Sequence, residues 1–352
     1  MKIVLTGGGT AGHVMPNLAL VDELSGIGYE IHYIGSRNGI ERSIVTSHNI
    51  KYHSVRTGKL RRYFDLKNFI DPFNIIIGII QSFILIRKIK PVLIFSKGGF
   101  VAVPVIIGAW LNRIPSITHE GDISVGLANK LCLPFVKKIC TAFQETTRNL
   151  PQSKAVYTGL PIRKMLLNGS KELGCKICGF SESSPVILVM GGSLGSLNIN
   201  KNIRNILPEL LKSFQVVHIC GKGNVDNNLE GTAGYKQFEF IGEELPHILA
   251  AADIAISRAG TNSVFELITL TKVCLFIPLS TSASRGEQVL TAKFMERTAL
   301  GKMLTENNLT RDSLLSEIED LYKNRETYIR NLNNFHLPNG TAEIIKLISE
   351  IA

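Results

Sequence analysis

Short apolar runs alternate with longer helical patterns along the whole chain, and a glycine-rich turn follows the first run of each half. The runs are KIVLT at 2–6, IHYIG at 31–35, VLIFS at 92–96, PVILVMGG at 185–192, FQVVHIC at 214–220, DIAIS at 253–257 and VCLFIP at 273–278. Their hydrophobicity is continuous rather than alternating, which is typical of parallel strands covered by helices on both faces. The pattern therefore predicts two doubly wound parallel-sheet domains of the α/β class.

Turn residues divide the two series of runs. The segment YTGLPIR, which ends at Arg163, marks the boundary. We expect an N-terminal domain of residues 1–160 and a C-terminal domain of residues 161–340. An amphipathic helix at 341–352, after Pro338 and Gly340, is expected to pack back on the first domain.

The charge of the chain is concentrated in its first half. Residues 1–160 hold 19 Lys and Arg against 9 Asp and Glu, a net of +10, whereas residues 161–352 hold 20 of each. This asymmetry indicates a polyanionic partner for one half, either nucleic acid or an anionic membrane surface. The basic residues are interleaved with long aliphatic side chains rather than arranged in a recognition motif, so we expect no nucleic-acid binding.

One segment, Arg56–Lys90, carries much of this charge. It has eight basic and two acidic residues around an Ile-rich helix. That combination predicts a peripheral anchor on an anionic membrane. The alternative is an ordinary helix buried over the sheet with a solvated rim. We expect both, with one helix face buried and the Lys59–Phe73 end exposed.

The N-terminal residues and the cysteines indicate where in the cell the protein is expected. The first residues, MKIVLTGGG, run directly into a glycine turn and have no features of a secretory signal, so we expect a cytoplasmic protein. Six scattered cysteines are too few for a disulfide framework. Cys175 and Cys178 form one CxxC pair without a second pair at metal spacing, which predicts free thiols and no metal site.

The first glycine turn, GGGTAGH, ends at His13 and lies between a strand and a helix, where main-chain N–H groups and the helix dipole attract an anion. The turn matches G-x-G-x-x-G, but the second strand ends in Ser36-Arg37 instead of the acidic residue that binds the ribose of NAD. A site for NADP, with Arg37 on its 2′-phosphate, stays open. His13 is either a general base or a histidine bonded to backbone.

Further glycine turns follow other strands: SKGGFVAVP at 96–104, GGSLGS at 191–196 and SRAGTNSVFE at 257–266. Several such turns at strand-to-helix junctions indicate a phosphate-bearing ligand in the cleft between the domains. The N–H groups of Thr261 to Ser263 are placed to meet a diphosphate. Glu266, about a turn further, is either a ligand for ribose hydroxyls or a solvated helix acid.

These motifs, together with HEGD at 119–122, GLPIR at 159–163 and GEQ at 286–288, resemble in order and spacing the MurG family of N-acetylglucosaminyltransferases of peptidoglycan synthesis. The resemblance covers the whole chain. It implies the GT-B fold, with two Rossmann-like domains facing across a cleft. It also implies inverting transfer of GlcNAc from UDP-GlcNAc to the lipid I acceptor, undecaprenyl-pyrophosphoryl-MurNAc-pentapeptide, without a metal or other cofactor.

The resemblance also implies roles for individual residues. His13 resembles the proposed general base, with Asp122 or His119 as the second candidates. The residues expected to contact substrates are Thr10, Ala11 and Gly12 at the transfer site, Asp122 and Gln288 at the sugar, Arg163 and Ser193 at the donor, Ile241 at the uracil edge, Thr261, Asn262 and Ser263 at the diphosphate and Glu266 at the ribose.

Three positions depart from the commonest pattern of the family. The usual HEQN is HEGD here, so that Asp122 replaces an amide. The usual amide or imidazole before Gln288 is Glu287, and Phe100 stands where many members have Tyr. An ionised Asp122 accepts hydrogen bonds but donates none, which alters its sugar contacts.

Two other functions stay open from the sequence. One is a GT-B transferase for a different lipid acceptor, such as a diacylglycerol glycosyltransferase. The other is a sugar-nucleotide-binding subunit without catalysis of its own.

Overall fold

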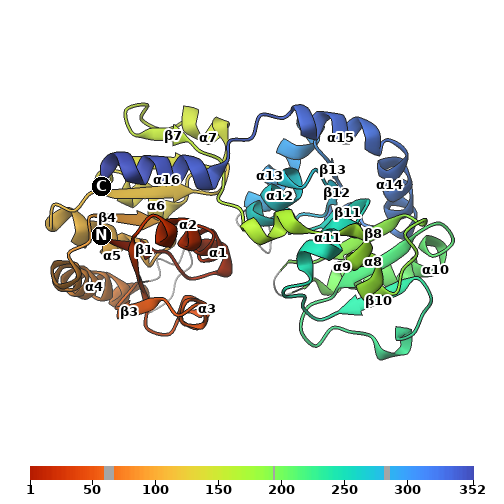
Figure 1. The fold of residues 1–352 in the computed structure, drawn as a ribbon, viewed down its shortest axis with the longest axis horizontal. Coiled ribbons are helices and arrows are strands. Elements are labelled where there is room, and N and C mark those ends of the chain that lie inside the picture. Colours follow the sequence, from red (N-terminus) through yellow and green to blue (C-terminus); the bar gives the residue numbers. More distant parts are fainter. Residues whose placement is uncertain (59–66, 193–194, 281–285) are drawn as a thin grey trace. The chain divides into compact units, whose positions relative to one another are not determined.

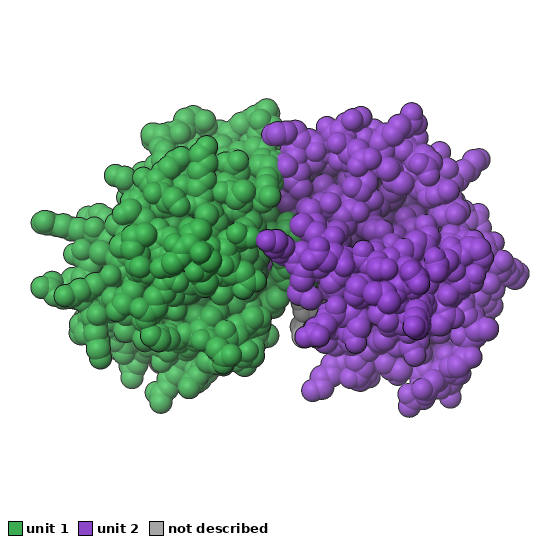
Figure 2. Space-filling view, in the orientation of Figure 1, with its two compact units in different colours: residues 1–163, 338–352 green, residues 164–337 purple. Residues whose placement is uncertain are grey.

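A computed structural model describes residues 1–58, 67–192, 195–280 and 286–352, and for residues 67–70 it describes the main chain alone. The chain forms two compact units (Figure 2). Unit 1 consists of residues 1–163 and 338–352, and unit 2 of residues 164–337.

Unit 1 is built on a parallel sheet in the order β3-β2-β1-β4-β5-β6-β7 (Figure 1). Its strands are β1 Lys2–Thr6, β2 Glu30–Ser36, β3 Lys51–Val55, β4 Leu93–Ser96, β5 Ser116–Glu120, β6 Lys138–Thr141 and β7 Ala155–Tyr157. Its helices are α1 Met15–Leu18, α2 Val21–Gly26, α3 Ile40–Ser47, α4 Lys67–Ile89, α5 Ala102–Leu111, α6 Leu127–Cys132, α7 Gln144–Arg148 and the C-terminal α16 Gly340–Ile351.

Helices cover both faces of this sheet, as the continuous hydrophobicity of its strands predicts. Ile3 and Leu5 of β1 lie in a buried cluster with Ile344 of α16. Val4, between them in the chain, lies in a second cluster with Ile86 of α4. Because alternate residues of a strand point to opposite faces, the two clusters lie on the two sides of the sheet.

Unit 2 repeats the same strand order, β10-β9-β8-β11-β12-β13, again with parallel neighbours. Its strands are β8 Val186–Met190, β9 Gln215–Ile219, β10 Tyr235–Phe238, β11 Ile254–Ser257, β12 Val273–Phe276 and β13 Lys302–Met303. Its helices are α8 Lys171–Cys178, α9 Leu197–Asn205, α10 Leu207–Leu210, α11 Leu245–Ala251, α12 Thr261–Thr269, α13 Glu287–Arg297, α14 Arg311–Lys323 and α15 Arg325–Asn334. The two doubly wound sheets confirm the predicted fold class.

The glycine turns lie where the strand order reverses. In unit 1, β1 and β4 are neighbours and the chain leaves them toward opposite edges of the sheet. In unit 2, β8 and β11 hold the same positions. Ligands of open α/β sheets bind outside the carboxyl ends of such strand pairs. The topology thus sets all four turns at potential ligand sites of their own unit.

Two local structures differ from the sequence predictions. The helix expected after GGGTAGH is a 3₁₀ turn, Ala11–His13, followed by the short α1 and α2. Pro16 occupies the first turn of α1, where the missing N–H costs nothing. The stretch with Cys175 and Cys178, for which no helix was predicted, forms α8, in which both are free, buried thiols. Burial raises the pKa of Cys178 to about 12.

Helix α4 has one buried and one exposed apolar face. Ser82 and Ile86 are fully buried toward the core. On the other side Phe73, Ile76, Ile80 and Ile84 are each more than half exposed and recur every three or four residues. By length and composition, Asp71–Ile89 is also apolar enough to cross a membrane, with a mean hydropathy of 1.5 and 22% of it buried. We call these four residues the α4 stripe.

Candidate active site

The first glycine turn is fixed by side chains from the first two strand–helix units. The hydroxyl of Tyr33 on β2 donates to the carbonyl oxygen of Gly7 over 2.7 Å. The carboxylate of Glu41 on α3 is fully buried. One of its oxygens accepts from the N–H of Gly9 over 3.2 Å, and the other accepts from the N–H of Ser36 over 2.9 Å. Glu41 therefore joins the turn to the carboxyl end of β2.

The second glycine turn packs directly on the first. A Cβ atom at Gly99 would lie 2.3 Å from the carbonyl oxygen of Gly8, and φ of Gly99 is +79°. Only glycine allows the two turns to approach so closely. The carbonyl oxygen of Lys97, in the same turn, lies 3.2 Å from Nδ1 of His13.

This contact settles the tautomer of His13. A carbonyl oxygen only accepts, so Nδ1 carries a proton, and in the neutral ring Nε2 bears the lone pair. His13 is half-buried at the end of the 3₁₀ turn. Thr10, Ala11 and Gly12 directly precede it, and Thr10 and Gly12 are exposed.

The HEGD segment at the end of β5 lies beside the second turn. His119 is fully buried, and its Nε2 donates to the carbonyl oxygen of Gly159 over 2.8 Å. Burial, reinforced by Lys97, holds the pKa of His119 well below its ordinary value. Because His119 is fully buried and its Nε2 donates to a main-chain carbonyl, the geometry favours His13 over His119 as the candidate base.

Glu120 and Asp122 have different surroundings. Glu120 is buried and accepts from the N–H groups of Asp122 and Gly126 and from the amide of Asn129. Burial, with Asp122 nearby, raises the pKa of Glu120. Asp122 itself is half-buried. Glu120 thus holds the loop in place, while Asp122 is accessible.

A buried lysine, Lys97, lies next to the HEGD loop. The side chain of Lys97 is 3% exposed, and its Nζ is 2.7 Å from where a Cβ of Gly121 would be. Burial lowers the pKa of this amine to about 8, although the carboxylates of Glu120 and Asp122 oppose the shift. Lys97 thus interacts with two of the predicted site residues of unit 1: its carbonyl oxygen bonds His13, and its amine interacts electrostatically with Asp122.

In unit 2 the turn after β8 leads into α9. Ser196 caps this helix by accepting from the N–H of Ile199 over 3.3 Å. A Cβ at Gly195 would lie 2.1 Å from the carbonyl oxygen of Cys220, so this position requires glycine. Ser193, the residue predicted to contact the donor here, lies outside the residues that the structure describes.

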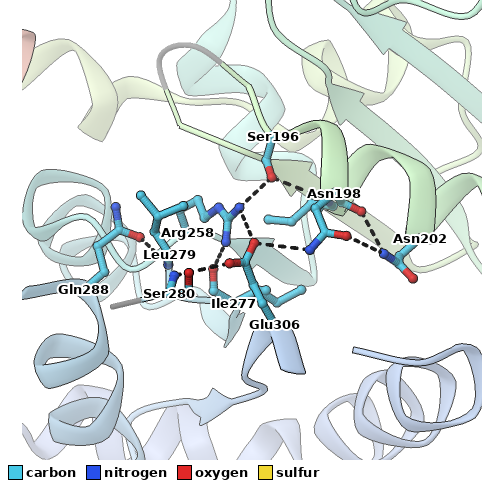
Figure 3. Close-up of polar contacts among 10 residues, drawn as sticks. Ser196, Asn198, Asn202, Arg258, Ile277, Leu279, Ser280, Gln288 and Glu306 are labelled. Carbon is cyan, nitrogen blue, oxygen red and sulfur yellow. Dashed lines mark hydrogen bonds and ion pairs between the residues drawn. The ribbon is translucent and has the colours of Figure 1, made fainter. Parts of the chain in front are cut away.

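A buried arginine joins the turns of unit 2 (Figure 3). Arg258, 8% exposed, follows β11, and its Nη2 donates to Oγ of Ser196 over 2.8 Å and to Oε1 of Glu306 over 2.7 Å. Its Nη1 donates to the carbonyl oxygen of Ile277. The other oxygen of Glu306 accepts from the N–H of Ser280. Three segments distant in the sequence thus meet at one guanidinium group.

Sequence reasoning missed this pair. Arg258 is part of SRAGTNSVFE, but a charged residue between the buried Ser257 and Ala259 is the only sign that it needs a partner. Burial raises the pKa of Glu306, but hydrogen bonds from Arg258 and Asn198 outweigh this, so the pKa lies below its ordinary value. Glu306 is therefore held as a carboxylate.

The remaining donor residues lie around the same turns of unit 2. Thr261, Asn262 and Ser263 form the first turn of α12, after Gly260, which provides no side-chain cap. Glu266 lies one turn further along and is half-buried. Gln288, in the first turn of α13, accepts at its Oε1 from the N–H of Leu279 over 3.0 Å.

Two further predicted residues belong to other segments of the chain. Ile241 is buried in the segment between β10 and α11. Arg163 is half-buried and is the last residue of the N-terminal part of unit 1.

Two family models match this chain, one in its first half and one in its second half. The glycosyltransferase family 28 N-terminal domain matches residues 3–141, and the family 28 C-terminal domain matches residues 186–348. A protein of Clostridium tetani (strain Massachusetts / E88) is 52% identical over 349 residues, 99% of this chain and 98% of the relative. It is named UDP-N-acetylglucosamine--N-acetylmuramyl-(pentapeptide) pyrophosphoryl-undecaprenol N-acetylglucosamine transferase. The chain belongs to the MurG family.

Other matches agree with membership of the MurG family. A relative of the same name from Geobacillus thermodenitrificans (strain NG80-2) is 52% identical over 352 residues, 100% of this chain and 99% of the relative. The crystal structure of MurG from Acinetobacter baumannii superposes with a TM-score of 0.78 at 25% identity, over 99% of each chain. The predictions of a glycosyltransferase and of the GT-B fold are therefore confirmed.

Proposed function

We propose that this protein transfers GlcNAc from UDP-GlcNAc to undecaprenyl-pyrophosphoryl-MurNAc-pentapeptide, converting lipid I to lipid II at the cytoplasmic face of the membrane. The observation that carries the proposal is identity of about half over the full length with N-acetylglucosamine transferases of this name. Unit 1 receives the acceptor and contacts the membrane, and unit 2 binds the nucleotide sugar. The concentration of positive charge in residues 1–160 supports this division.

His13 is the general base in this proposal. Nε2 takes the proton of the attacking acceptor hydroxyl while the new bond forms at the anomeric carbon of GlcNAc. The bond from that carbon to UDP breaks, and UDP leaves with the electron pair. The contact between Nδ1 and the carbonyl oxygen of Lys97 supports the role, because it keeps the proton on Nδ1 and orients the ring.

The donor is held by unit 2. The first turns of α9 and α12 each follow a glycine turn at a strand end, and their main-chain N–H groups attract the diphosphate. Glu266 binds the ribose, Ile241 the uracil edge through its main chain, and Gln288 the GlcNAc hydroxyls. Arg163 and Ser193 contact the donor, while Thr10 to Gly12 and Asp122 line the transfer site.

The α4 stripe is the membrane-contacting surface in this proposal. Phe73, Ile76, Ile80 and Ile84 enter the interface, and Arg87 and Lys88 in the last turn of α4 meet anionic headgroups. The α4 stripe is apolar over several helical turns, whereas a solvated helix would be polar on that face. The Lys59–Phe73 end, which was expected to be exposed, lies outside the described side chains except at residues 71–73.

Transfer of labelled GlcNAc to a lipid I analogue, with and without EDTA, tests the reaction. We expect equal transfer in both conditions. Transfer to diacylglycerol but not to lipid I would assign a different lipid acceptor. Binding of UDP-GlcNAc without transfer to either would indicate a non-catalytic subunit.

Vesicle flotation tests the membrane surface separately. We expect the protein to float with anionic vesicles at low salt, and Ile76→Ser with Ile80→Ser to weaken this about 30-fold or more, since the two buried side chains together contribute about 2–4 kcal/mol. Leu173→Ser, at an exposed leucine of unit 2, is the matched control. Equal binding to neutral and anionic vesicles would contradict the electrostatic part of the proposal.

A further inference from the structure

Three arginines of unit 1 surround a cavity of about 470 Å³. Its lining consists of Arg37, Arg42, Ser54, Val55, Arg56 and Gln81. Ser36 and Val55 pair across β2 and β3, and Arg37 and Arg56 follow them directly. The carboxyl ends of two neighbouring parallel strands thus bring Arg37 and Arg56 to one edge of the sheet, and Arg42 joins them from α3. We call this the arginine cavity.

The arginine cavity is strongly cationic. Among the residues that the structure describes, no carboxylate forms an ion pair with any of its three arginines. Nη1 of Arg42 donates to the carbonyl oxygen of Arg37 over 3.3 Å. The carboxylate next to Arg42 in the chain, Glu41, is fully buried and accepts from the main chain of Gly9 and Ser36. The guanidinium groups at the cavity are therefore exposed and available to a dianion.

The arginine cavity lies between the first glycine turn and the α4 stripe. On one side, Glu41 connects Ser36, the neighbour of Arg37, to Gly9 of the turn. On the other, Gln81 of α4 accepts through Oε1 from the N–H of Arg56 over 2.7 Å. Ile80 of the α4 stripe is the chain neighbour of Gln81. A ligand with a sugar, a phosphate and a hydrocarbon chain in that order fits this sequence of surfaces.

The chemistry of the acceptor requires a phosphate site that is separate from the base. A pyrophosphoryl group on a sugar is attached at its anomeric carbon, so the attacking hydroxyl belongs to another carbon of the ring. With that hydroxyl at His13, the pyrophosphate lies across the ring from His13. Guanidinium groups suit such a dianion because they bind phosphate oxygens through two parallel hydrogen bonds.

We propose that the arginine cavity binds the pyrophosphate of a polyprenyl-linked acceptor. This inference rests on the proposed function, because it names the part of unit 1 that receives the phosphates of the lipid acceptor. An anionic phospholipid headgroup carries related phosphate chemistry, and the experiment distinguishes the two.

The test measures binding of the full-length protein to vesicles. One set consists of phosphatidylcholine with undecaprenyl pyrophosphate, and the other of phosphatidylcholine with phosphatidylglycerol at equal surface charge. We expect Arg37→Gln with Arg42→Gln, two lining arginines outside the Arg56–Lys90 segment, to weaken binding to the first set at least about tenfold, and to leave binding to the second set unchanged. Inorganic pyrophosphate is expected to compete with the first set only. Arg148→Gln, at an exposed arginine of α7, is the matched control.

Two outcomes would overturn the proposal: unchanged binding to undecaprenyl pyrophosphate, or an equal loss for both vesicle sets, which would assign the arginine cavity to bulk phospholipid. Thermal unfolding followed by Trp110 fluorescence checks that the variants fold, and Arg37→Lys with Arg42→Lys keeps the charge if they do not. The assay needs no turnover. A protein that binds through the arginine cavity but transfers no GlcNAc would contradict the proposed function and leave this inference standing.

Discussion

Each unit buries a cation beside its glycine turns, and the two cations have opposite surroundings. In unit 2, Arg258 forms an ion pair with Glu306 at 2.7 Å and bonds two further groups. In unit 1, Lys97 forms no ion pair within 4.0 Å in the part of the chain that the structure describes, and burial lowers its pKa to about 8. Both residues follow a central strand of the same topology, β4 in unit 1 and β11 in unit 2.

This difference separates the features that the shared strand order determines from those that individual side chains determine. The shared strand order places glycine turns at the same points of both sheets. In unit 2 a paired guanidinium group holds three segments together. In unit 1 the turns are held by Glu41 and Tyr33, and the lysine is left near the accessible Asp122. The two units therefore differ in what a substitution at the cation should do.

The variant His13→Ala should show the largest difference between the functions of the two units. We expect turnover to fall about 10²–10⁴-fold, the usual contribution of a general base, while binding of UDP-GlcNAc is unchanged. The reason is that His13 belongs to unit 1, whereas most of the residues proposed to contact the donor belong to unit 2. Initial rates of GlcNAc transfer and calorimetric titration of UDP-GlcNAc measure the two effects. His48→Ala, at an exposed histidine of unit 1, is the control, and near-native turnover of His13→Ala would remove His13 as the base.

Breaking the paired cation should destabilise unit 2 selectively. We expect Arg258→Met to lower the free energy of unfolding of this unit by about 3 kcal/mol, because the partly buried carboxylate of Glu306 loses its partner and the hydrogen bonds to Ser196 and Ile277 are lost as well. Far-UV circular dichroism in urea measures the loss. Trp110, the single tryptophan of the chain, lies on α5 and reports on unit 1, whose transition should not move.

The double variant Arg258→Met with Glu306→Gln is the control for this prediction. It removes both charges, so we expect part of the lost stability to return. If the double variant were as unstable as Arg258→Met alone, the pair would not be the cause.

The strands that sequence reasoning identified and those it missed differ in composition. Every apolar run that it named forms a strand, among them β1, β8 and β11. It did not identify β5, SITHE, although all five residues are buried. His119 and Glu120 interrupt its hydrophobicity, and the hydrogen bonds that allow their burial come from Gly159, Gly126 and Asn129, which no local pattern reveals. The edge strands β3 and β13 are polar or only two residues long.

The residues of the candidate site also divide into those that could be predicted from the sequence and those that could not. The glycine turns could be predicted, because tight turns and close approaches restrict the residue type itself. The residues that hold them could not, since Arg258 and Glu306 are 48 positions apart and Glu41 meets Gly9 across 32. The arginine cavity could not be predicted from the sequence either, because it depends on the register of β2 and β3.

The anchor of the first glycine turn should matter less than the ion pair of unit 2. We expect Glu41→Gln to lower the stability of unit 1 by about 2 kcal/mol, because the new NH₂ group would face N–H donors and leave hydrogen bonds unmade. Urea unfolding followed by Trp110 fluorescence measures this, with Glu350→Gln at an exposed site as control. Slower hydrogen exchange at Gly9 in the variant would contradict the role of Glu41.

Lys97, which has no ion-pair partner among the described residues, predicts that the free energy of unfolding of unit 1 depends on pH. Arg258 gives unit 2 no such dependence. The pKa of Lys97 is about 8 in the folded protein and about 10.5 in the unfolded chain. Between these values the unfolded chain binds more protons, so the free energy of unfolding rises with pH, by at most about 1.4 kcal/mol per pH unit. Other groups titrate in the same range, and the difference from Lys97→Met isolates this contribution. We expect the stability of unit 1 relative to Lys97→Met, followed by Trp110 in urea, to be lowest below pH 8 and to increase toward pH 10.5. A difference that stays constant or decreases over this range would show that Lys97 is paired as well as Arg258 is, and the contrast between the units would fail.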